Sequence, residues 1–276
     1  MKKIAFLVMS LSVLAFTSCG DDDKDSPSNQ GGNSGVVTGG TGDSTSKDFV
    51  SSGTENGYDY VDLGLSSGTL WATCNVGAAI PQGYGSYYAW GETSPKTGYT
   101  WATYKYGNDS LAITKYCVDA AHGKDGFTDN LKTLEPEDDA AYVNWGGNWR
   151  MPTSAQRQEI IDECYWVYTD SYKKSMVSGY IVYKAKASAD KGTVIPKGLT
   201  PSDAYSLADE HIFLPMAGAR LGGGLSKAGI ACTYACSSLY TSNSSRLRHI
   251  TIESEGVRST QGYRYCGHVV RPVCHK

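Results

Sequence analysis

The 276-residue sequence has no apolar run long enough to cross a membrane as a helix. A spanning helix needs ~20 apolar residues, and the main apolar stretch covers only Ile4 to Phe16. Lys2 and Lys3 precede this stretch, and small residues lead from it to Cys19. The pattern is typical of a secretory signal peptide, so we expect the rest of the chain to lie outside the cytoplasm.

Basic clusters are also missing. The 25 Lys and Arg residues are outnumbered by 28 Asp and Glu residues, which gives a net charge of -3. A protein that binds a phosphate backbone needs a basic patch or stripe, and none is visible in this sequence. We therefore expect no nucleic-acid partner.

Histidine is scarce, with 5 residues, and none lies in a motif that also supplies a nucleophile and an orienting acid. The segment Gly64 to Gly68 matches a serine-hydrolase pattern, but the strand-like residues after it indicate a hairpin turn instead of a strand-to-helix elbow. We expect no enzyme and no cofactor, with catalysis kept as a further hypothesis.

Long helical patterns are few. The sequence has 20 tyrosines and 32 glycines against 5 phenylalanines, and its apolar runs are short. This composition favours short strands and turns, and hence an α+β fold of short twisted antiparallel strands with long ordered loops. One main helix is predicted at about 153–167, because Thr153 and Gln156 form a capping box ahead of apolar residues at helical spacing.

Other segments are predicted from alternation and turn residues. Segments 58–63 and 69–74 should form a hairpin, and 137–143 should form a short helical turn. Further strands are predicted at 179–183, 212–215, 249–252 and 268–273. Segment 84–101 should be a long loop, and 184–210 should be an insertion of low periodicity.

The N-terminal segment resembles a bacterial lipoprotein precursor. Leu14 to Cys19 followed by Gly20 implies cleavage before Cys19 and lipidation of its thiol, and Asp21 to Asp23 resembles an export signal of Bacteroidota. The resemblance implies a lipid-anchored protein of the outer membrane, exposed at the cell surface. The alternatives are a plain secretory signal and an acidic stretch that only keeps a linker solvated.

Three parts follow from this pattern. Residues 1–18 are the signal peptide, and residues 19–55 are the lipidated cysteine with a Gly-, Ser- and Asp-rich tether. Such a tether cannot bury enough apolar surface to fold, and it would span ~30 Å as a random coil. Residues 56–276 should form one domain.

Seven cysteines remain after Cys19, and their pairing is open. They are Cys74, Cys117, Cys164, Cys232, Cys236, Cys266 and Cys274. Outside the cytoplasm these thiols can form disulfides, but an odd number leaves at least one unpaired within the chain. A metal cluster of the C-terminal cysteines with His268 and His275 is the alternative; we expect disulfides or buried thiols and no metal site.

Six motifs occur in one order along the domain. They are Val61–Leu65, Gly68–Ala78, Tyr88–Thr93, Asn144–Thr153, Ile212–Pro215 and Val270–Val273. Together they resemble the Fibrobacter succinogenes major paralogous domain family, which is similar to the C-type lectin-like fold in its formylglycine-generating-enzyme branch. The resemblance implies a surface module whose two chain ends lie near each other, and it implies no particular reaction.

The C-terminal stretch from Cys232 to Val273 is the predicted contact surface, because loops on a rigid sheet can vary without disturbing the core. Tyr and Arg dominate binding hot spots. The candidate ligand-binding residues are Tyr234, Tyr240, Arg246, Arg248, His249, Arg258, Tyr263, Arg264, Tyr265 and His268. Trp101 is a further candidate for stacking on a sugar, whereas Trp71, Trp145 and Trp149 should be core.

These residues predict a non-catalytic binding lipoprotein whose ligand is a glycan or a surface protein. Two alternatives stay open. The tail also resembles the variable region of diversity-generating retroelement targets, although Cys236 stands where such tails have tryptophan, whose codon contains no adenine to vary. This resemblance implies variable positions at Arg246, Arg248, His249, Arg258, Tyr263, Tyr265 and Cys266. The second alternative is a structural or adhesive component of the cell surface.

Overall fold

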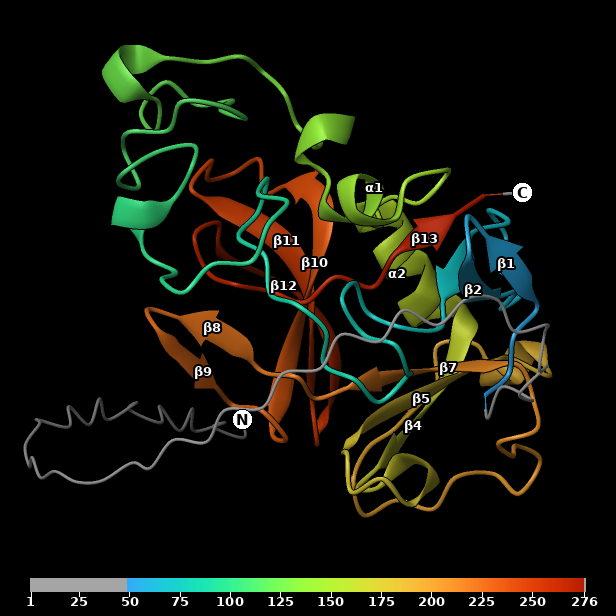
Figure 1. Ribbon diagram of the computed structural model, residues 1–276. Coiled ribbons are helices and arrows are strands. Elements are labelled where there is room, and N and C mark those ends of the chain that lie inside the picture. The colour runs from blue at the N-terminus through green and yellow to red at the C-terminus, as the bar shows by residue number, and fades with distance from the viewer. Residues whose placement is uncertain (1–48, 276) are drawn as a thin grey trace, which may run out of the picture. The chain divides into compact units, whose positions relative to one another are not determined.

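The computed structural model describes residues 49–275 of the chain, which belong to one compact unit, Ser46–Lys276. This part is an α+β fold in which strands predominate and two short α-helices are present (Figure 1). Between residues 49 and 275, no helix combines the length and the hydropathy needed to cross a membrane. The predicted signal peptide, Cys19 and tether residues 19–48 lie outside the described residues.

The strands form four sheets, and the first contains both ends of the domain. Its strands are β1 (Gly53–Glu55), β2 (Tyr58–Val61), β3 (Leu70–Ala72) and β13 (Val273–Cys274). The predicted hairpin is confirmed, because β2 and β3 pair antiparallel with Val61 opposite Trp71. Since β1 pairs with β2, the folded part begins before residue 56, and the predicted tether boundary is a few residues too late.

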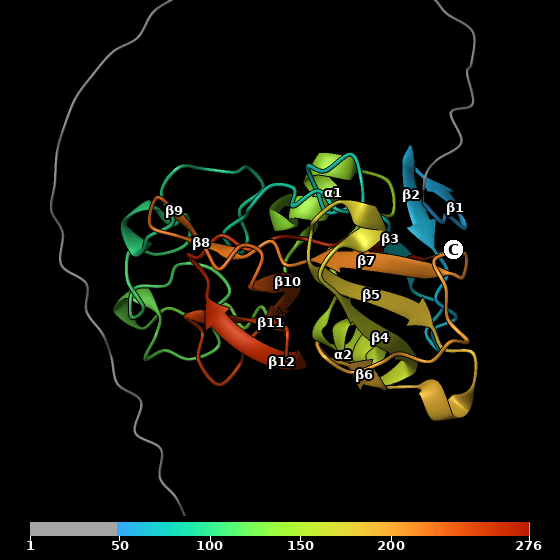
Figure 2. The ribbon, with the colours of Figure 1, turned by 90° about the horizontal axis from the view of Figure 1, so that it is seen from below.

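The second sheet has three strands and the third has four. One has the order β10-β11-β12 and the other β6-β4-β5-β7, as Figure 2 shows from below. Their strands are β10 (Ala231–Leu239), β11 (Arg246–Glu253) and β12 (Gly256–Tyr263), then β6 (Val194–Ile195), β4 (Cys164–Thr169), β5 (Gly179–Lys184) and β7 (His211–Pro215). Only β4 and β6 pair in parallel; every other pairing among the described strands is antiparallel. A separate hairpin joins β8 (Ala219–Leu221) to β9 (Gly224–Ser226).

The predicted strands at 179–183, 212–215 and 249–252 lie within β5, β7 and β11. The predicted strand at 268–273 is wrong for most of its length. His268 and Val269 make only isolated bridges, and strand β13 begins at Val273. Strands β10 and β12 were not predicted from the sequence.

Helix α2 (Ser154–Glu163) is shorter than the predicted helix. Its capping box is confirmed: the Thr153 side chain accepts from the Gln156 N–H, and the Gln156 side chain reaches back to the Thr153 N–H. Its end is wrong, because Cys164 begins strand β4. The run from Cys164 to Thr169 is rich in aromatic and β-branched residues, and pairing with β5 outweighs continued helical periodicity.

The second predicted helical turn is confirmed as α1 (Ala140–Trp145), preceded by a 3-10 turn. Asp139 caps it: its carboxylate accepts from the N–H groups of Ala141 at 2.8 Å and Tyr142 at 3.0 Å. The same carboxylate accepts from Met151 N–H at 2.9 Å, and burial raises the pKa of Asp139. One buried side chain therefore joins α1 to the segment that leads into α2.

Long segments without regular structure are held by two buried arginines. From Thr73 to Thr100 the chain forms neither a helix nor a strand, and the green segments of Figure 1 that lead to α1 add only three short 3-10 turns. Arg271 donates to Asn75 Oδ1 at 2.8 Å and to the carbonyl oxygens of Ala72, Thr73 and Phe213 at 3.1, 2.7 and 2.8 Å. It thus joins the C-terminal segment to β3, to the loop after it and to β7.

Arg264 acts in the same way at the other side of the domain. Its guanidinium donates to Tyr104 Oη at 2.9 Å and to the carbonyl oxygens of Lys115, Tyr116 and Ser244 at 2.8, 3.1 and 2.9 Å. It also lies 4.7 Å from the ring centroid of Trp90. Because arginine supplies five donors in a fixed plane, one side chain can hydrogen bond to several carbonyl groups that have no partner in a sheet.

Arg271→Met should lower the free energy of unfolding by about 3 kcal/mol or more, because each buried acceptor left unsatisfied costs ~1–3 kcal/mol. Arg258→Met, which changes an exposed arginine paired with Glu253, should cost less than ~1 kcal/mol. Urea unfolding followed by tryptophan fluorescence measures both. Equal urea midpoints for the two variants would contradict the stabilising role of the buried Arg271.

Candidate ligand-binding site

Four of the ten predicted ligand-binding residues are buried and belong to the core. Tyr234, His249, Arg264 and His268 are 4%, 5%, 0% and 3% exposed. Their prediction as contact residues is therefore wrong for this structure. Tyr234 shows the reason, because its hydroxyl donates to the Pro215 carbonyl oxygen at 2.8 Å and so binds β10 to β7.

The two buried histidines lie against each other. The ring centroids of His249 and His268 are 5.3 Å apart, and His268 Nδ1 is 2.7 Å from the Thr233 hydroxyl. His249 Nδ1 has no hydrogen-bond partner among the described residues. Burial lowers the pKa of His249 to about 2 and that of His268 to about 4, so both rings are neutral at pH 7.

These histidines should make the fold sensitive to mild acid. Below pH ~6.5 the unfolded chain binds protons at both residues while the folded protein does not, so stability is full above that pH and is lost as the pH falls. Each residue should contribute a loss of ~1.4 kcal/mol per pH unit between pH ~6.5 and its folded pKa. Urea unfolding at pH 7 and pH 5 measures this, with His249→Gln/His268→Gln as the comparison. If the double variant lost as much stability between pH 7 and pH 5 as the unaltered protein, the two histidines would not be the cause of the acid sensitivity.

Three aromatic rings and one arginine gather at the surface, and we call them the aromatic cluster: Trp101, Tyr263, Tyr265 and Arg246. The ring centroids of Trp101 and Tyr265 are 4.9 Å apart, and those of Tyr263 and Tyr265 are 5.5 Å apart with nearly parallel planes. The Arg246 guanidinium lies 4.3 Å from the Tyr263 ring centroid. Tyr263 is 38% exposed, and the other three residues are half-buried.

The backbone explains why these rings face outward. Arg246 in β11 pairs directly with Tyr263 at the end of β12. Strand β12 ends at Tyr263, and residues 263–266 form a turn in which the Cys266 N–H donates to the Tyr263 carbonyl at 3.2 Å. Arg264 within this turn is buried, whereas Tyr263 and Tyr265 on either side of it stay partly exposed. Trp101 begins a 3-10 turn and packs edge-on against Tyr104, which hydrogen bonds to Arg264.

The remaining predicted residues lie outside the aromatic cluster. Arg248 stacks on Tyr240, with 5.2 Å from the guanidinium to the ring centroid. Arg258 lies near the start of β12, away from Tyr263 at the strand's end, and pairs with Glu253 at 2.5 Å. Of the ten predicted residues, the structure brings Arg246, Tyr263 and Tyr265 together, beside the separately noted Trp101.

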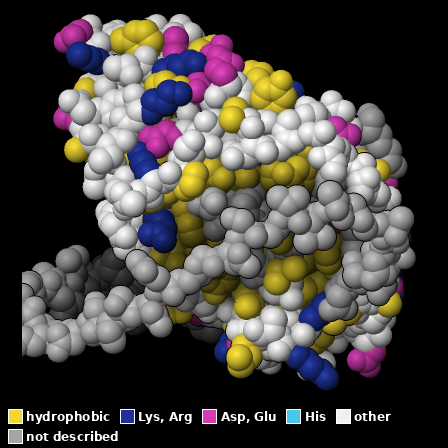
Figure 3. Space-filling view, in the orientation of Figure 1, with side chains coloured by type: hydrophobic (Ala, Val, Ile, Leu, Met, Phe, Trp, Pro, Cys, Tyr) yellow, Lys and Arg dark blue, Asp and Glu magenta, His cyan; other side chains and the backbone are white. Residues whose placement is uncertain are grey.

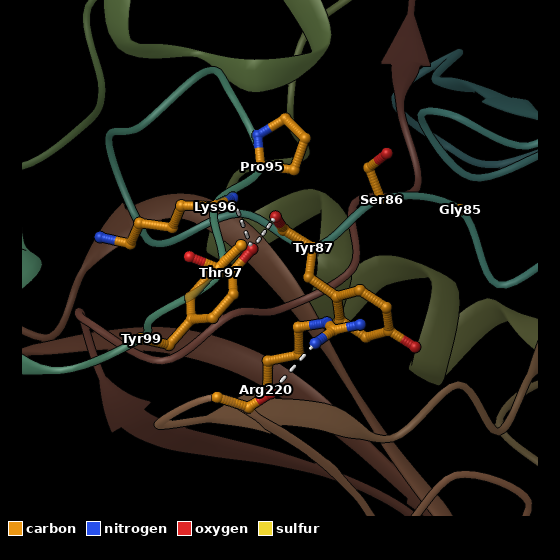
Figure 4. Close-up of a pocket in the computed structure, with 9 residues that line it drawn as sticks. Gly85, Ser86, Tyr87, Pro95, Lys96, Thr97, Tyr99 and Arg220 are labelled. Atoms are coloured by element: carbon orange, nitrogen blue, oxygen red, sulfur yellow. Dashed lines mark hydrogen bonds between the residues drawn. The ribbon is translucent and has the colours of Figure 1, made fainter. Parts of the chain in front are cut away.

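A pocket of about 380 Å³ lies between Tyr99, Tyr87 and Arg220 (Figure 4). It is lined by Gly85, Ser86, Tyr87, Pro95, Lys96, Thr97, Tyr99, Arg220 and Gly223. Tyr99 forms part of its wall and precedes Trp101 by two residues. Arg220 pairs through its backbone with Gly267, which follows Tyr265 by two residues. The pocket and the aromatic cluster therefore share two backbone segments.

Arg220 is the charged group that faces this pocket. Its backbone N–H donates to Gly267 O at 2.8 Å and its carbonyl accepts from Gly267 N–H at 2.9 Å. The guanidinium lies 5.3 Å from the Tyr87 ring centroid. Lys96 points its ammonium away, to Glu92 at 2.8 Å and the Thr103 carbonyl at 2.8 Å (Figure 4). Sequence reasoning missed Arg220 and Tyr87, which lie in segments without a recognised binding pattern.

A group of carboxylates elsewhere already holds a protein cation. Glu135, Glu137 and Asp138 bring oxygen atoms within 4.8 Å of one another. The Lys115 ammonium lies 2.6 Å from Glu135 and 2.7 Å from Asp138, and it supplies the positive charge there. Hydrogen bonds from Lys115 and from two tyrosines lower the pKa of Asp138 to about 2 in spite of its burial.

The seven cysteines do not form disulfides with one another between residues 49 and 275, and all except Cys266 are buried. Burial raises the pKa of Cys266 to about 11 and that of Cys232 to about 12, so these thiols are protonated at pH 7.

Charged side chains on the face in Figure 3 are of both signs and intermixed. Comparison of the chain with protein-family models, with curated proteins and with solved structures finds no match.

Gly267→Ala should disturb the pocket and the aromatic cluster together. An added Cβ would lie 2.6 Å from Cε1 of the buried Tyr99 ring, so the ring or the segment must move. Such overpacking costs ~1–3 kcal/mol. Gly224→Ala in the β8–β9 hairpin meets nothing closer than 3.8 Å and should be neutral. Thermal melting compares them, and an unchanged melting temperature for Gly267→Ala would contradict the packing described.

Proposed function

We propose that this chain is a non-catalytic glycan-binding lipoprotein with a C-type lectin-like domain of the Fibrobacter succinogenes major paralogous type. The proposal includes lipidation of Cys19 and display at the outer face of the outer membrane. Support comes from the first sheet, in which the two ends of the domain meet, and from the motif residues Trp71, Trp149 and Arg271, which are all buried in the core.

The observation that carries the proposal is the aromatic cluster. Five of the six tryptophans are buried, whereas Trp101 stays half-exposed against two surface tyrosines. Flat rings cover the apolar faces of sugars, and their hydroxyl and indole groups supply hydrogen bonds. The cluster shares two backbone segments with a pocket whose volume suits a small ring, which favours a glycan over a flat protein surface.

The geometry around the cluster supports binding without catalysis. His249 and His268 are buried and neutral, and they contact the core instead of the pocket. The nearest cysteine in sequence, Cys266, has a raised pKa and is a poor nucleophile at pH 7. No base is paired with a nucleophile among the residues that line the pocket.

One observation favours a second candidate, a variable receptor-binding protein. Arg246, Tyr263 and Tyr265 are among the positions expected to vary in that class, and they lie side by side at the surface. His249, another such position, is buried beside helix α2, and Arg157 of that helix donates to its carbonyl. Burial of this position favours a fixed binding surface.

Removal of the cluster's rings should weaken glycan binding. On a glycan array, Trp101→Ala and Tyr263→Ala should each reduce affinity at least ~10-fold, which corresponds to ~1.4 kcal/mol. Tyr58→Ala is the matched control, because Tyr58 in β2 is 36% exposed and outside the cluster. Binding of a surface protein through the same residues would favour the protein ligand. Glycan binding that is unchanged in both cluster variants would contradict the proposed site.

A further inference from the structure

We propose that Arg220 binds the carboxylate of an acidic saccharide in the pocket beside the aromatic cluster. The inference deepens the glycan-binding function proposed above and rests on it. It assigns the pocket to a uronic or sialic acid unit, whose ring would fill the space and whose carboxylate would meet the guanidinium.

The donors of Arg220 are largely unused within the protein. A guanidinium offers five N–H donors, and the contact that one of them makes is to the Gly223 carbonyl at 3.4 Å. Among the described residues no carboxylate forms an ion pair with it, whereas Arg258 pairs with Glu253. A planar guanidinium of this kind matches a carboxylate through two parallel hydrogen bonds.

Of the other described arginines, Arg246 and Arg248 contact tyrosine rings and do not line the pocket, and the rest have partners elsewhere. Arg264 and Arg271 are fully buried and satisfied by protein acceptors, and the guanidinium of Arg157 is buried beside β11. Arg150 donates to the Gly147 and Trp149 carbonyl groups and lies 3.9 Å from the Tyr142 ring centroid. Arg220 therefore combines a half-exposed position, an adjoining pocket and unused donors.

Arg220 is also held in place before any ligand arrives. Two backbone hydrogen bonds join it to Gly267, and the left-handed φ of Gly222, +59°, turns the chain after β8. The Tyr87 ring supports the guanidinium, and the Tyr87 hydroxyl is fixed to the Ala217 carbonyl at 2.5 Å. A side chain ordered in advance loses less conformational entropy on binding.

The lining of the pocket favours an anion. No Asp or Glu lines it, so an incoming carboxylate meets no like charge there. Lys96 does not compete for the ligand, because its ammonium is held by Glu92 and the Thr103 carbonyl. The hydroxyl of Thr97, an exposed lining residue, is available to a sugar hydroxyl. A volume of about 380 Å³ lies in the range of small-ligand pockets.

The position of the pocket relative to the aromatic cluster explains how one oligosaccharide would use both. Residues 99–101 contribute Tyr99 to the pocket and Trp101 to the cluster, and residues 265–267 contribute Tyr265 to the cluster and the backbone partner of Arg220. A neutral unit would stack on the rings while the acidic unit enters the pocket. Specificity for acidic saccharides would then come from Arg220 and affinity from the rings.

The test measures binding of 3′-sialyllactose and trigalacturonate, each beside its methyl ester, to the full chain purified in detergent. The ester keeps the sugar ring and removes the charge. At least one acid should bind at least ~10-fold more tightly than its ester. Arg220→Gln should abolish that preference, and Arg220→Lys should keep only part of it, because an ammonium lacks the planar pair of donors. Arg258→Gln, an exposed arginine outside the site, should leave the preference unchanged.

Each other result overturns a defined part of the account. Equal binding of acid and ester by the unaltered chain, or a preference that survives in Arg220→Gln, overturns the role of Arg220 and leaves saccharide binding standing. Preference for a sulfated oligosaccharide over both carboxylates overturns the carboxylate assignment. Absence of binding to any saccharide on an array overturns the proposed function itself. If circular dichroism shows that Arg220→Gln does not fold, the comparison of acid with ester on the unaltered chain still decides whether the protein prefers a carboxylate.

Discussion

Buried arginines in the C-terminal segment are the interaction on which the rest of this structure depends. Long stretches of the domain form no sheet or helix, so their carbonyl groups need partners from elsewhere. Arg264 and Arg271 supply these partners, each with three hydrogen bonds to backbone carbonyl groups and one to a side-chain oxygen. Burial lowers the pKa of Arg271, yet arginine stays charged in proteins, so its hydrogen bonds are charge-assisted. The C-terminal segment from Arg264 to Arg271 therefore holds the loops that surround it in place.

The same constraint produces the surface that we assign to ligand binding. Arg264 is buried in the turn that follows β12, and Tyr263 and Tyr265 on either side of it stay partly exposed. Tyr104 accepts a hydrogen bond from Arg264 and packs against Trp101, so the third ring is placed by the same anchor. The aromatic cluster is therefore preformed by core packing, and its rings need little ordering when a ligand arrives. A rigid body with surface rings suits the binding function that we propose.

Several features could be predicted from the sequence, because their causes are local. The hairpin of β2 and β3 follows from alternation around a Gly- and Ser-rich turn, and the Thr153–Gln156 capping box follows from residue types at fixed spacing. The burial of Trp71 and Trp149 followed from their motifs. The buried positions of Arg264, His249 and His268 could not be read in this way. Polar residues usually lie at the surface, and only tertiary contacts that span most of the chain reveal their partners. Arg220 gave no local signal either, because its pocket is assembled from loops distant in sequence.

The most direct test of the central claim is a crystal structure of the domain with an oligosaccharide that it binds. The account predicts a sugar ring stacked on Trp101, Tyr263 or Tyr265, with Arg264 buried beneath them and bonded to Tyr104. A sugar bound elsewhere would contradict it, for example in the cavity of about 220 Å³ lined by Gln156 and His275. A C-terminal segment whose Arg264 is released to solvent would contradict it equally.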